Sequence, residues 1–369
     1  MTKIYLICSA EAEGDLYRIA QGHFNDRITD RGWRQIKALE KGFAHIQIDK
    51  VYTSDLYHAC ATASAIYKPK SLISYKRKIL RENCMGKWEG RNWGNIAYED
   101  AQQLRNFKTA PEKWHVDGAE TPQQVLSRML NSIRQIASEN EGKSVAVISH
   151  CFAIRYLLAE LQGIPVKEVH KLPMVKNTAV SIIEAEAGLL RLVTENDISH
   201  LEDKDYQAYE KPYETLDFDT DMYFQPLPWV EYGEIMAEAI KCVWQEAGED
   251  RLFNKHILLE DAAMLQTIIG FVEQEPAGFL QFGMEPGSIT LLCTHPGCRR
   301  AGLGVQLIGQ AVMAARAKGG DYLRIALPKQ NPYRKFFLNY GFILAGENEK
   351  GRDILEKNIG LDSEFLRGL

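Results

Sequence analysis

Residues 3–14 read KIYLICSAEAEG, and this stretch decides how the first half of the chain is interpreted. The run KIYLI is apolar and β-branched, and it passes through small residues into acidic ones. Such a run predicts a buried strand that delivers a loop at its carboxyl end. The residues at the tip of that strand are Cys8, Ser9, Ala10 and Glu11. Because ligands of α/β proteins bind at the carboxyl ends of strands, these residues mark a candidate site.

The segments that follow alternate between strand and helix signals. After Thr29 or Asp30, either of which would cap a helix, apolar residues recur at helical spacing. These residues are Trp33, Ile36, Leu39 and Phe43. Residues 144–150 form an apolar strand pattern with a helix directly behind it, and a hairpin is expected to turn at Ala187-Gly188. The alternation predicts a mostly parallel sheet with helices on both faces.

The length and charge of the chain bound its organisation and partners. A chain of 369 residues is too long for one ordinary core, so two domains are expected. The formal net charge of −5 argues against nucleic acid or an anionic membrane surface as a partner. Near residue 201 the alternating pattern gives way to an acidic, aromatic stretch without periodicity. We therefore expect a first domain at 1–203, a linker at 204–220 and a second domain at 221–369.

Cysteine usage and apolar stretches bear on location. The seven cysteines are scattered and odd in number, which is typical of a reducing cytosol rather than of a disulfide framework. The first residues lack a basic region followed by a long apolar run, so no signal peptide is expected. The most apolar stretch, 145–161, is interrupted by His150 and Arg155 and is interpreted as a buried strand and a core helix. The sequence therefore predicts a cytoplasmic protein.

A series of motifs over residues 3–201 resembles the histidine phosphatase (phosphoglycerate mutase-like) family in order and spacing. That family opens with a strand ending R-H-G-E and continues with Q-G, V-Y-S-S-D-L-x-R-A, W-E-G and V-S-H-G. The corresponding stretches here are Gln21-Gly22, VYTSDLYHA (51–59), GKWEG (86–90), VISH (147–150) and the closing NDISHL (196–201). The resemblance implies a three-layer α/β/α domain.

The resemblance also implies a mechanism for the first domain. The family forms a phosphohistidine in a pocket that holds a neutral histidine nucleophile, two arginines and a second histidine. Arginine forks match phosphate oxygens and stabilise the charge that develops during phosphoryl transfer. In this chain Ser9 stands at the position of the nucleophile, and Cys8 and His58 stand at the positions of the two arginines.

Further departures and two matches complete the comparison with the family pattern. Ala10 and Cys151 replace two glycines, whereas His150 and the presumed acid Glu82 match the family. Several departures at one site favour decay or repurposing over ordinary drift. The opening strand is thus predicted to deliver a dismantled phosphatase site, in a domain that is catalytically inactive.

Several interpretations of this pocket stay open. Ser9 becomes a nucleophile if His150 lies beside it as a base. Cys8 and Cys151 should converge with His150, with His58 nearby; metal binding or redox pairing is one role for the thiols, and small buried hydrophobes is another. No close paired spacing such as C-x-x-C supports a metal, and we predict none. His150 could be satisfied by its hydroxyl and thiol neighbours, or the remodelled pocket could bind a smaller or less charged ligand.

In the second domain, the apolar strand SITLLCT (288–294) is followed by HPGC and then RRAGLG (299–304), which opens a helical pattern. This arrangement resembles motif A of the GNAT-type N-acetyltransferases, [QR]-x-x-G-x-[GA], and implies an α+β domain that takes acetyl-CoA as co-substrate. Glycines let a backbone approach a pyrophosphate closely, and a helix N-terminus adds a favourable dipole. A side chain at Gly302 or Gly304 is expected to block that approach or strain the turn, and Gly304→Val is expected to weaken acetyl-CoA binding strongly while leaving the fold largely intact. The expected acetyl-CoA contacts are Leu292, Cys293, Thr294, Arg299, Arg300, Ala301, Gly302, Leu303 and Gly304.

Downstream, RKFFLNYGF (334–342) resembles the family's F-Y-x-x-x-G-F motif, so that the resemblance covers about 221–355. The tyrosine that often protonates the departing CoA thiolate in this family falls at Phe337, which cannot donate a proton. Tyr333 and Tyr340 are candidates for that role, although helical spacing puts them on faces other than that of Phe337. No carboxylate stands out as the base.

The sequence predicts acetyl transfer from acetyl-CoA to an amine, either a small molecule or a peptide. Two alternatives stay open. One is a phosphatase or mutase that acts through a non-standard first site, and the other is a non-catalytic protein that binds metabolites. No nucleic acid or membrane partner is expected, and a homodimer is left open.

Overall fold

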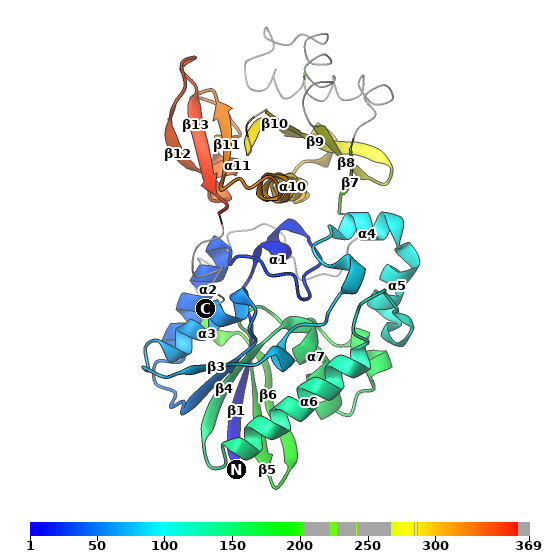
Figure 1. Cartoon of the computed structure of the whole chain (residues 1–369), viewed down its shortest axis with the longest axis vertical. Helices are drawn as coiled ribbons and strands as arrows, with labels where there is room; N and C mark the ends of the chain where they lie inside the picture. Colours follow the sequence, from blue (N-terminus) through cyan, green and yellow to red (C-terminus); the bar gives the residue numbers. More distant parts are fainter. Residues whose placement is uncertain (202–220, 227–240, 242–266, 284, 286, 361–369) are drawn as a thin grey trace. The chain divides into compact units, whose positions relative to one another are not determined.

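The computed structural model describes residues 1–201, 221–226, 241, 267–283, 285 and 287–360, which form two compact units (Figure 1). The first unit contains Met1–Arg91 and the described residues from Glu99 to Leu201. The second contains Asn92–Tyr98 and the described residues from Asp221 onward. The predicted linker at 204–220 lies outside the described residues.

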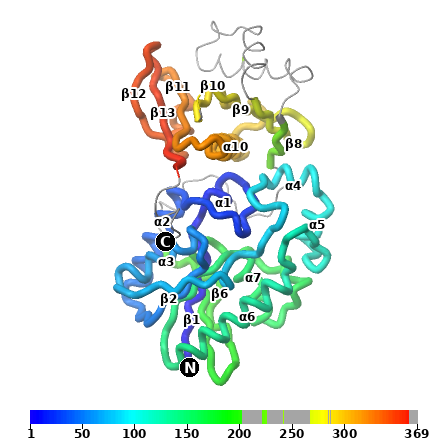
Figure 2. Tube along the Cα trace, viewed as in Figure 1, coloured from blue at the N-terminus to red at the C-terminus, as the bar shows by residue number. Residues whose placement is uncertain are grey.

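The first unit is built on a six-stranded sheet in the order β3-β2-β4-β1-β5-β6. Its strands are β1 (Thr2–Cys8), β2 (Lys50–Thr53), β3 (Ser74–Lys76), β4 (Ser144–Ser149), β5 (Val180–Glu186) and β6 (Leu189–Asp197). The first four strands pair in parallel, and β5 and β6 add an antiparallel edge. The mostly parallel sheet expected from the sequence is confirmed, and β1 runs through its interior (Figure 2). The hairpin between β5 and β6 turns at Ala187 and Gly188, both with positive φ.

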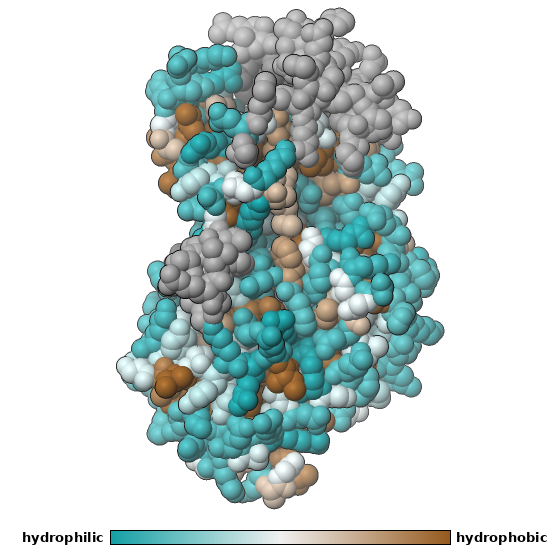
Figure 3. Space-filling model, in the orientation of Figure 1, coloured by the Kyte–Doolittle hydropathy of each residue, from teal (hydrophilic) through white to brown (hydrophobic). Residues whose placement is uncertain are grey.

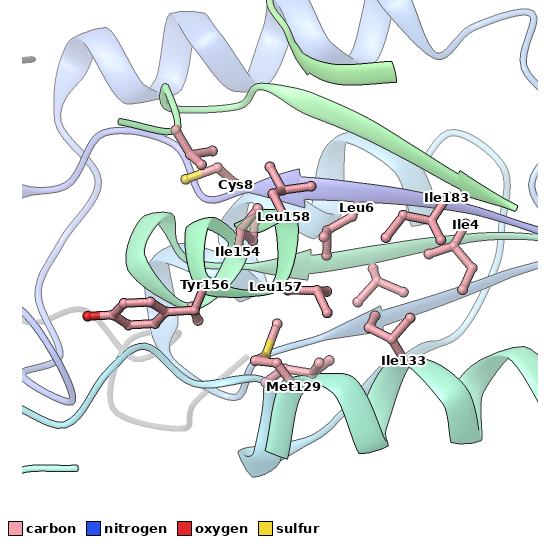
Figure 4. Packing of buried hydrophobic residues seen from close by; sticks show 14 of the residues in the cluster. Ile4, Leu6, Cys8, Met129, Ile133, Ile154, Tyr156, Leu157, Leu158 and Ile183 are labelled. Atoms are coloured by element: carbon pink, nitrogen blue, oxygen red, sulfur yellow. The ribbon is translucent and has the colours of Figure 1, made fainter. Parts of the chain in front are cut away.

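Helices cover both faces of this sheet. One face packs against α2 (Asp30–Gly42) and α3 (Tyr57–Tyr67), and the other against α6 (Pro122–Glu139) and α7 (Cys151–Leu161). The remaining helices of this part of the chain are α1 (Glu13–Tyr17), α4 (Trp93–Glu99) and α5 (Ala101–Thr109). Ile4 and Leu6 of β1 pack toward α6 and α7, as Figure 4 shows beside Leu157 and Ile133. The alternate residues of β1 pack into a second cluster with residues of α2. The result is the three-layer α/β/α arrangement.

Local signals fix where α2 begins. Thr29 is its N-cap, and the Thr29 hydroxyl accepts a hydrogen bond from the backbone N–H of Gly32 at 2.9 Å. Ile36 and Leu39 are buried as the helical spacing predicted. Trp33 was placed on the same stripe from the sequence but is 41% exposed. The buried face of α2 is formed by Gly32, Gln35, Ile36 and Leu39, and Trp33 lies at the edge of that face.

The second unit contains a seven-stranded sheet in the order β12-β13-β11-β10-β9-β8-β7. Its strands are β7 (Tyr223–Pro226), β8 (Thr267–Val272), β9 (Glu275–Phe282), β10 (Ser288–Thr294), β11 (Tyr322–Leu327), β12 (Ile343–Glu347) and β13 (Asp353–Asn358). Its described helices are α10 (Leu303–Ala317) and α11 (Arg334–Asn339). Only β10 and β11 pair in parallel within the described sheet. The sequence of residues 230–247, VEYGEIMAEAIKCVWQEA, also predicts a helix, but these residues lie outside the described part of the chain apart from residue 241.

A short segment of the first family region belongs to the second unit. The side-chain amide of Asn95 donates to the carbonyl of Phe224 at 2.9 Å and its oxygen accepts from the Phe224 N–H at 3.0 Å. The ring of Tyr98 stacks on that of Tyr223 at 4.2 Å. A Cβ on Gly94 would lie 2.1 Å from the carbonyl oxygen of Met222, so the approach requires glycine. The domain boundaries predicted from the sequence, at 203 and 221, do not assign residues 92–98 to the second unit.

Figure 3 shows a mostly hydrophilic face with small separate hydrophobic patches. Among the helices that the structure describes, none combines the length and apolar character needed to cross a membrane.

Candidate functional site

The first candidate site lies where β1 and β4 end. Cys8 is opposite Ser149 in the parallel ladder, so that Ser9 and His150 follow side by side on neighbouring strands. The backbone N–H of Ser9 donates to the carbonyl of Ser149 at 2.9 Å. The Sγ atoms of Cys8 and Cys151 are 2.6 Å apart. The structure therefore brings together the thiols and the histidine that the sequence placed at this end of the sheet.

Two histidines form a buried pair at this site. Nε2 of His58, from the first turn of α3, lies 2.9 Å from Nδ1 of His150, and both residues are 2% exposed. Behind His58, Oδ1 of Asp26 lies 3.5 Å from Nδ1, and Nε2 of Gln21 contacts both of these atoms. Nε2 of His150 is buried without a hydrogen-bond partner. Burial, and then the nearby His58, lower the pKa of His150 well below its usual range, so His150 is neutral at neutral pH.

The structure gives Glu82 a role other than that of a free acid. Its two carboxylate oxygens accept hydrogen bonds from the backbone N–H groups of Phe152 and Ala153, each at 2.8 Å, and Oε1 also accepts from Asn83. Phe152 and Ala153 lie in the first turn of α7, where N–H groups have no partner within the helix. Burial raises the pKa of Glu82 to about 7 in spite of these bonds. The Glu82 carboxylate thus accepts hydrogen bonds from N–H groups in the first turn of α7, the helix that begins at Cys151.

The pocket is rich in buried carboxyl groups. Burial raises the pKa of Asp15 to about 6 and also raises that of Asp26. Two neighbouring arginines are engaged in contacts of their own. Arg81 forms a bidentate pair with Asp55 at 2.6 and 2.7 Å, and Arg128 binds Glu120 and three backbone carbonyls. The site therefore combines two imidazoles, two thiols and several carboxyl groups.

The second candidate site lies at the start of α10. Gly302, with φ of 76°, is the N-cap of this fifteen-residue helix, and no side chain caps it. Arg300 also has a positive φ, of 61°, so the loop turns sharply ahead of the helix. The side chains of Leu303 and Val305 are buried and anchor the first turn. The first N–H groups of α10 thus stand at the end of a long helix without a side-chain acceptor.

The strand that leads into this loop diverges from its neighbour. β10 pairs with β11 only at Ser288 and Ile289, whereas it continues to pair with β9 as far as Thr294. The predicted contact residues Leu292, Cys293 and Thr294 lie in the part of β10 beyond the parallel ladder. Of these, Cys293 is buried and the other two are half-buried.

Aromatic residues of α11 border the loop. The ring of Phe336 occupies the space beside Gly304, since a Cβ there would lie 2.9 Å from the Phe336 Cζ. A side chain at Gly304 would have to displace this ring, which is a packing cost that the sequence did not reveal, and its effect on the fold stays a prediction. The guanidinium of Arg299 lies 5.5 Å from the ring centroid of Tyr333, and Tyr340 packs edge-on against Phe336. Phe337 is buried.

Two family models match this chain, one in each of its two family regions. A model described as the histidine phosphatase superfamily (branch 1) matches residues 4–198, more than half of the chain. The chain belongs to the histidine phosphatase superfamily. A model of the acetyltransferase (GNAT) domain matches residues 234–356, so the histidine phosphatase domain is joined to a GNAT domain. Both resemblances found in the sequence are confirmed.

Individual relatives match the histidine phosphatase domain. Phosphoserine phosphatase 1 of Hydrogenobacter thermophilus is 24% identical over 186 residues, which cover 50% of this chain and 88% of that protein. A probable phosphoglycerate mutase GpmB of Erwinia tasmaniensis is 24% identical over 208 residues, covering 55% of this chain and 96% of that protein. The solved structure of Bacillus stearothermophilus YhfR aligns with a TM-score of 0.54 and 27% identity, over 55% of this chain and all of that one.

Sequence reasoning missed part of the histidine phosphatase site. Asp15 and Asp26 were not singled out, although both have raised pKa values and Asp26 lies behind His58. They stand on irregular or short segments between recognisable motifs, where no periodicity marks a buried carboxyl group. Within the described residues, no group of three or more His, Cys, Asp and Glu side chains is arranged to hold a metal ion.

Proposed function

We propose that this protein is an acetyl-CoA-dependent N-acetyltransferase whose GNAT domain acetylates an amine, either a small molecule or a peptide. The observation that carries the proposal is the uncapped start of α10. Gly302 provides the left-handed turn, and the N–H groups of the first helical turn are free of side-chain acceptors. Such a terminus binds phosphate groups through its N–H donors and its dipole.

The divergence of β10 and β11 supports a place for the pantetheine arm. Beyond Ile289, the edge of β10 that faces β11 leaves the parallel ladder. An extended amide-containing chain can pair with such a strand edge through main-chain hydrogen bonds. Leu292, Cys293 and Thr294 would then line the arm, and the loop 299–304 would hold the pyrophosphate.

The chemistry asks for a proton donor near the departing thiolate. Acetyl-CoA supplies an activated thioester acetyl group. Tyr333 begins α11 and lies against Arg299 of the loop, whereas Tyr340 lies at the other end of α11 against Phe336. Proximity to the loop supports Tyr333 as the donor. Tyr333→Phe should lower kcat by roughly 10²-fold with little change in acetyl-CoA affinity, whereas Tyr340→Phe should leave kcat within about threefold.

We further propose that the histidine phosphatase domain does not transfer phosphoryl groups. A phosphate dianion needs positive donors, but the positions of the family's arginines hold Cys8 and His58. The buried carboxyl groups of Asp15, Asp26 and Glu82 oppose a second source of negative charge. We propose the non-catalytic binding of a less charged ligand as one role for this site.

The deciding experiment titrates acetyl-CoA into the full-length protein by calorimetry and follows release of free CoA with small amines, aminoglycosides and peptides. Arg300→Glu should weaken acetyl-CoA binding by roughly tenfold at low salt, with a smaller effect at high salt. Lys350→Glu is the matched control, because Lys350 is an exposed cation in the turn between β12 and β13. No acetyl-CoA binding by the parent protein, or equal effects of the two charge reversals, would overturn the proposal.

A further inference from the structure

Two cysteines meet at the end of β1. Cys8 is the last residue of that strand, and Cys151 is the first residue of α7. Adjacent strands of a sheet are about 4.8 Å apart, and Cys8 faces Ser149, two residues before Cys151. The backbone alone therefore holds the two residues close together. Their Sγ atoms are 2.6 Å apart although the residues are 143 positions apart in sequence.

The two cysteines differ in how far they are buried. Cys8 is fully buried in the cluster between the sheet and α7 (Figure 4), whereas Cys151 is half-buried as a residue. Among the described cysteines, Cys60 lies against the carbonyl of Ser54 and Cys84 against that of Gly118, and neither contacts another sulfur. Cys84 has an exposure comparable to that of Cys151 and so makes an internal control.

We propose that Cys8 and Cys151 are a redox-active pair that a hydroperoxide converts into an intramolecular disulfide. Sulfur of Cys151 attacks the peroxide oxygen, the O–O bond breaks, and Cys151 becomes a sulfenic acid as one water leaves. Sulfur of Cys8 then displaces the hydroxyl group of the sulfenic acid, the S–S bond forms, and a second water leaves. Two thiols and one H₂O₂ thus give one disulfide and two H₂O, and a dithiol reductant reverses the change.

The surroundings of the two thiols determine the rate of disulfide formation. Burial raises the pKa of Cys8, and the contact with Cys8 together with burial raises the pKa of Cys151. The carboxyl groups of Asp15 and Glu82 add to both effects. Because the thiolate is the attacking species, disulfide formation should be slow at neutral pH and faster as the pH rises. The pair therefore responds to sustained oxidant rather than to brief exposure.

The disulfide would tie β1 to α7. Ser9 directly follows β1 and His150 directly precedes α7, so the bond would hold both residues in place and remove the two thiols from the site. A cross-link between residues 143 positions apart closes a long loop and restricts the unfolded chain. Oxidation should accordingly raise the thermal unfolding midpoint of the full-length protein by several degrees.

The test treats the full-length protein with hydrogen peroxide, alkylates the remaining thiols and digests with trypsin. Cys8 and Cys151 fall in separate tryptic peptides, IYLICSAEAEGDLYR (4–18) and SVAVISHCFAIR (144–155), and each peptide has no other cysteine. The expected product is the cross-linked pair of peptides, lighter by two hydrogen atoms than their sum and cleaved by dithiothreitol. The cross-link should persist in Cys84→Ser and vanish in both Cys8→Ser and Cys151→Ser.

Two results would overturn the proposal. One is peroxide treatment that oxidises Cys84 while Cys8 and Cys151 remain alkylated as free thiols. The other is oxidation of Cys151 to a sulfinic acid while Cys8 remains a free thiol. The thermal measurement is independent of digestion: a midpoint that rises on oxidation equally in wild type and Cys8→Ser would also contradict the pair.

Discussion

At the scale of single residues, the side chains at the end of β1 bear on the proposed inactivity of the histidine phosphatase domain. Ser9 follows Cys8 at the tip of the strand, and His150 presents one unpartnered, buried ring nitrogen. A serine needs a base to become a nucleophile, and a neutral His150 is such a base. At the two positions where the family pattern has arginine this chain has Cys8 and His58, which is why we propose that the site does not transfer phosphoryl groups.

We expect the full-length protein to release no more phosphate from generic phosphomonoesters than the Ser9→Ala variant does. The comparison measures inorganic phosphate over time at equal protein concentration, with His150→Ala as a second variant. Robust hydrolysis that is lost in both variants would establish a serine mechanism and remove the proposed inactivity of this domain.

Asp15 should leave a signature in the pH dependence of stability. Burial raises its pKa from 3.8 to about 6, so the folded protein holds this proton longer than the unfolded chain does. The stability that this group contributes is present below about pH 4 and is lost as the pH rises toward about 6. In Asp15→Asn that loss is absent, and an amide oxygen can still accept from the Ala12 N–H, which lies 3.0 Å from Asp15 Oδ2.

Thermal unfolding midpoints of wild type and Asp15→Asn, measured from pH 4 to pH 7, test this sign. The difference should move in favour of the variant as the pH rises through the window, because every other titrating group is shared. A constant difference between the two proteins across that range would show that Asp15 ionises normally.

At the scale of elements, the contact between α10 and α11 depends on a missing side chain. The Phe336 ring fills the space next to Gly304, in the first turn of α10. We expect Gly304→Ala to destabilise the second unit by about 1–3 kcal/mol, as overpacking of a tight contact does. A second change that shrinks the neighbour, Phe336→Leu, should recover part of that loss.

Thermal unfolding and acetyl-CoA titration of both variants separate packing from binding. If Gly304→Ala lowers affinity but not stability, the glycine serves the ligand; if the double variant is no more stable than Gly304→Ala, the ring is not the cause of the strain.

Individual helices and strands also show which features of the structure could be predicted from the sequence. Thr29 and the buried stripe of α2 were predictable because caps and helical spacing are local signals. The meeting of Cys8 with Cys151 followed from a family pattern that supplies the parallel pairing of β1 and β4. The pairing of Gly304 with Phe336 was not predictable, because it depends on how two helices cross, and nothing near either residue encodes that angle.

At the scale of the whole molecule, the chain leaves the first unit after Arg91 and returns to it at Glu99. Within the second unit, Asn95 makes two hydrogen bonds to the backbone of Phe224, on the edge strand β7. Sequence reasoning could not find this exchange, since the partners are 129 residues apart and the segment carries the pattern of its own family region.

We expect Asn95→Ala to destabilise the second unit by about 1–3 kcal/mol, since two backbone groups of β7 lose their partners. Hydrogen exchange should show faster exchange of the Phe224 amide. Gln102→Ala, an exposed amide on α5, is the matched control and should change neither measurement. Unchanged protection at Phe224 in Asn95→Ala would mean that this contact contributes nothing to the strand.

The excursion at 92–98 also has a consequence for biosynthesis. The ribosome adds roughly 5–20 residues per second, and Asn95 precedes Phe224 by 129 positions. The nascent chain therefore waits about 6–26 s between translation of the helix and translation of the strand that it pairs with. During that interval the amide of Asn95 and the ring of Tyr98 have no β7 to bind. Slowed or paused elongation after codon 98 would lengthen this exposure and give a chaperone time to hold the segment.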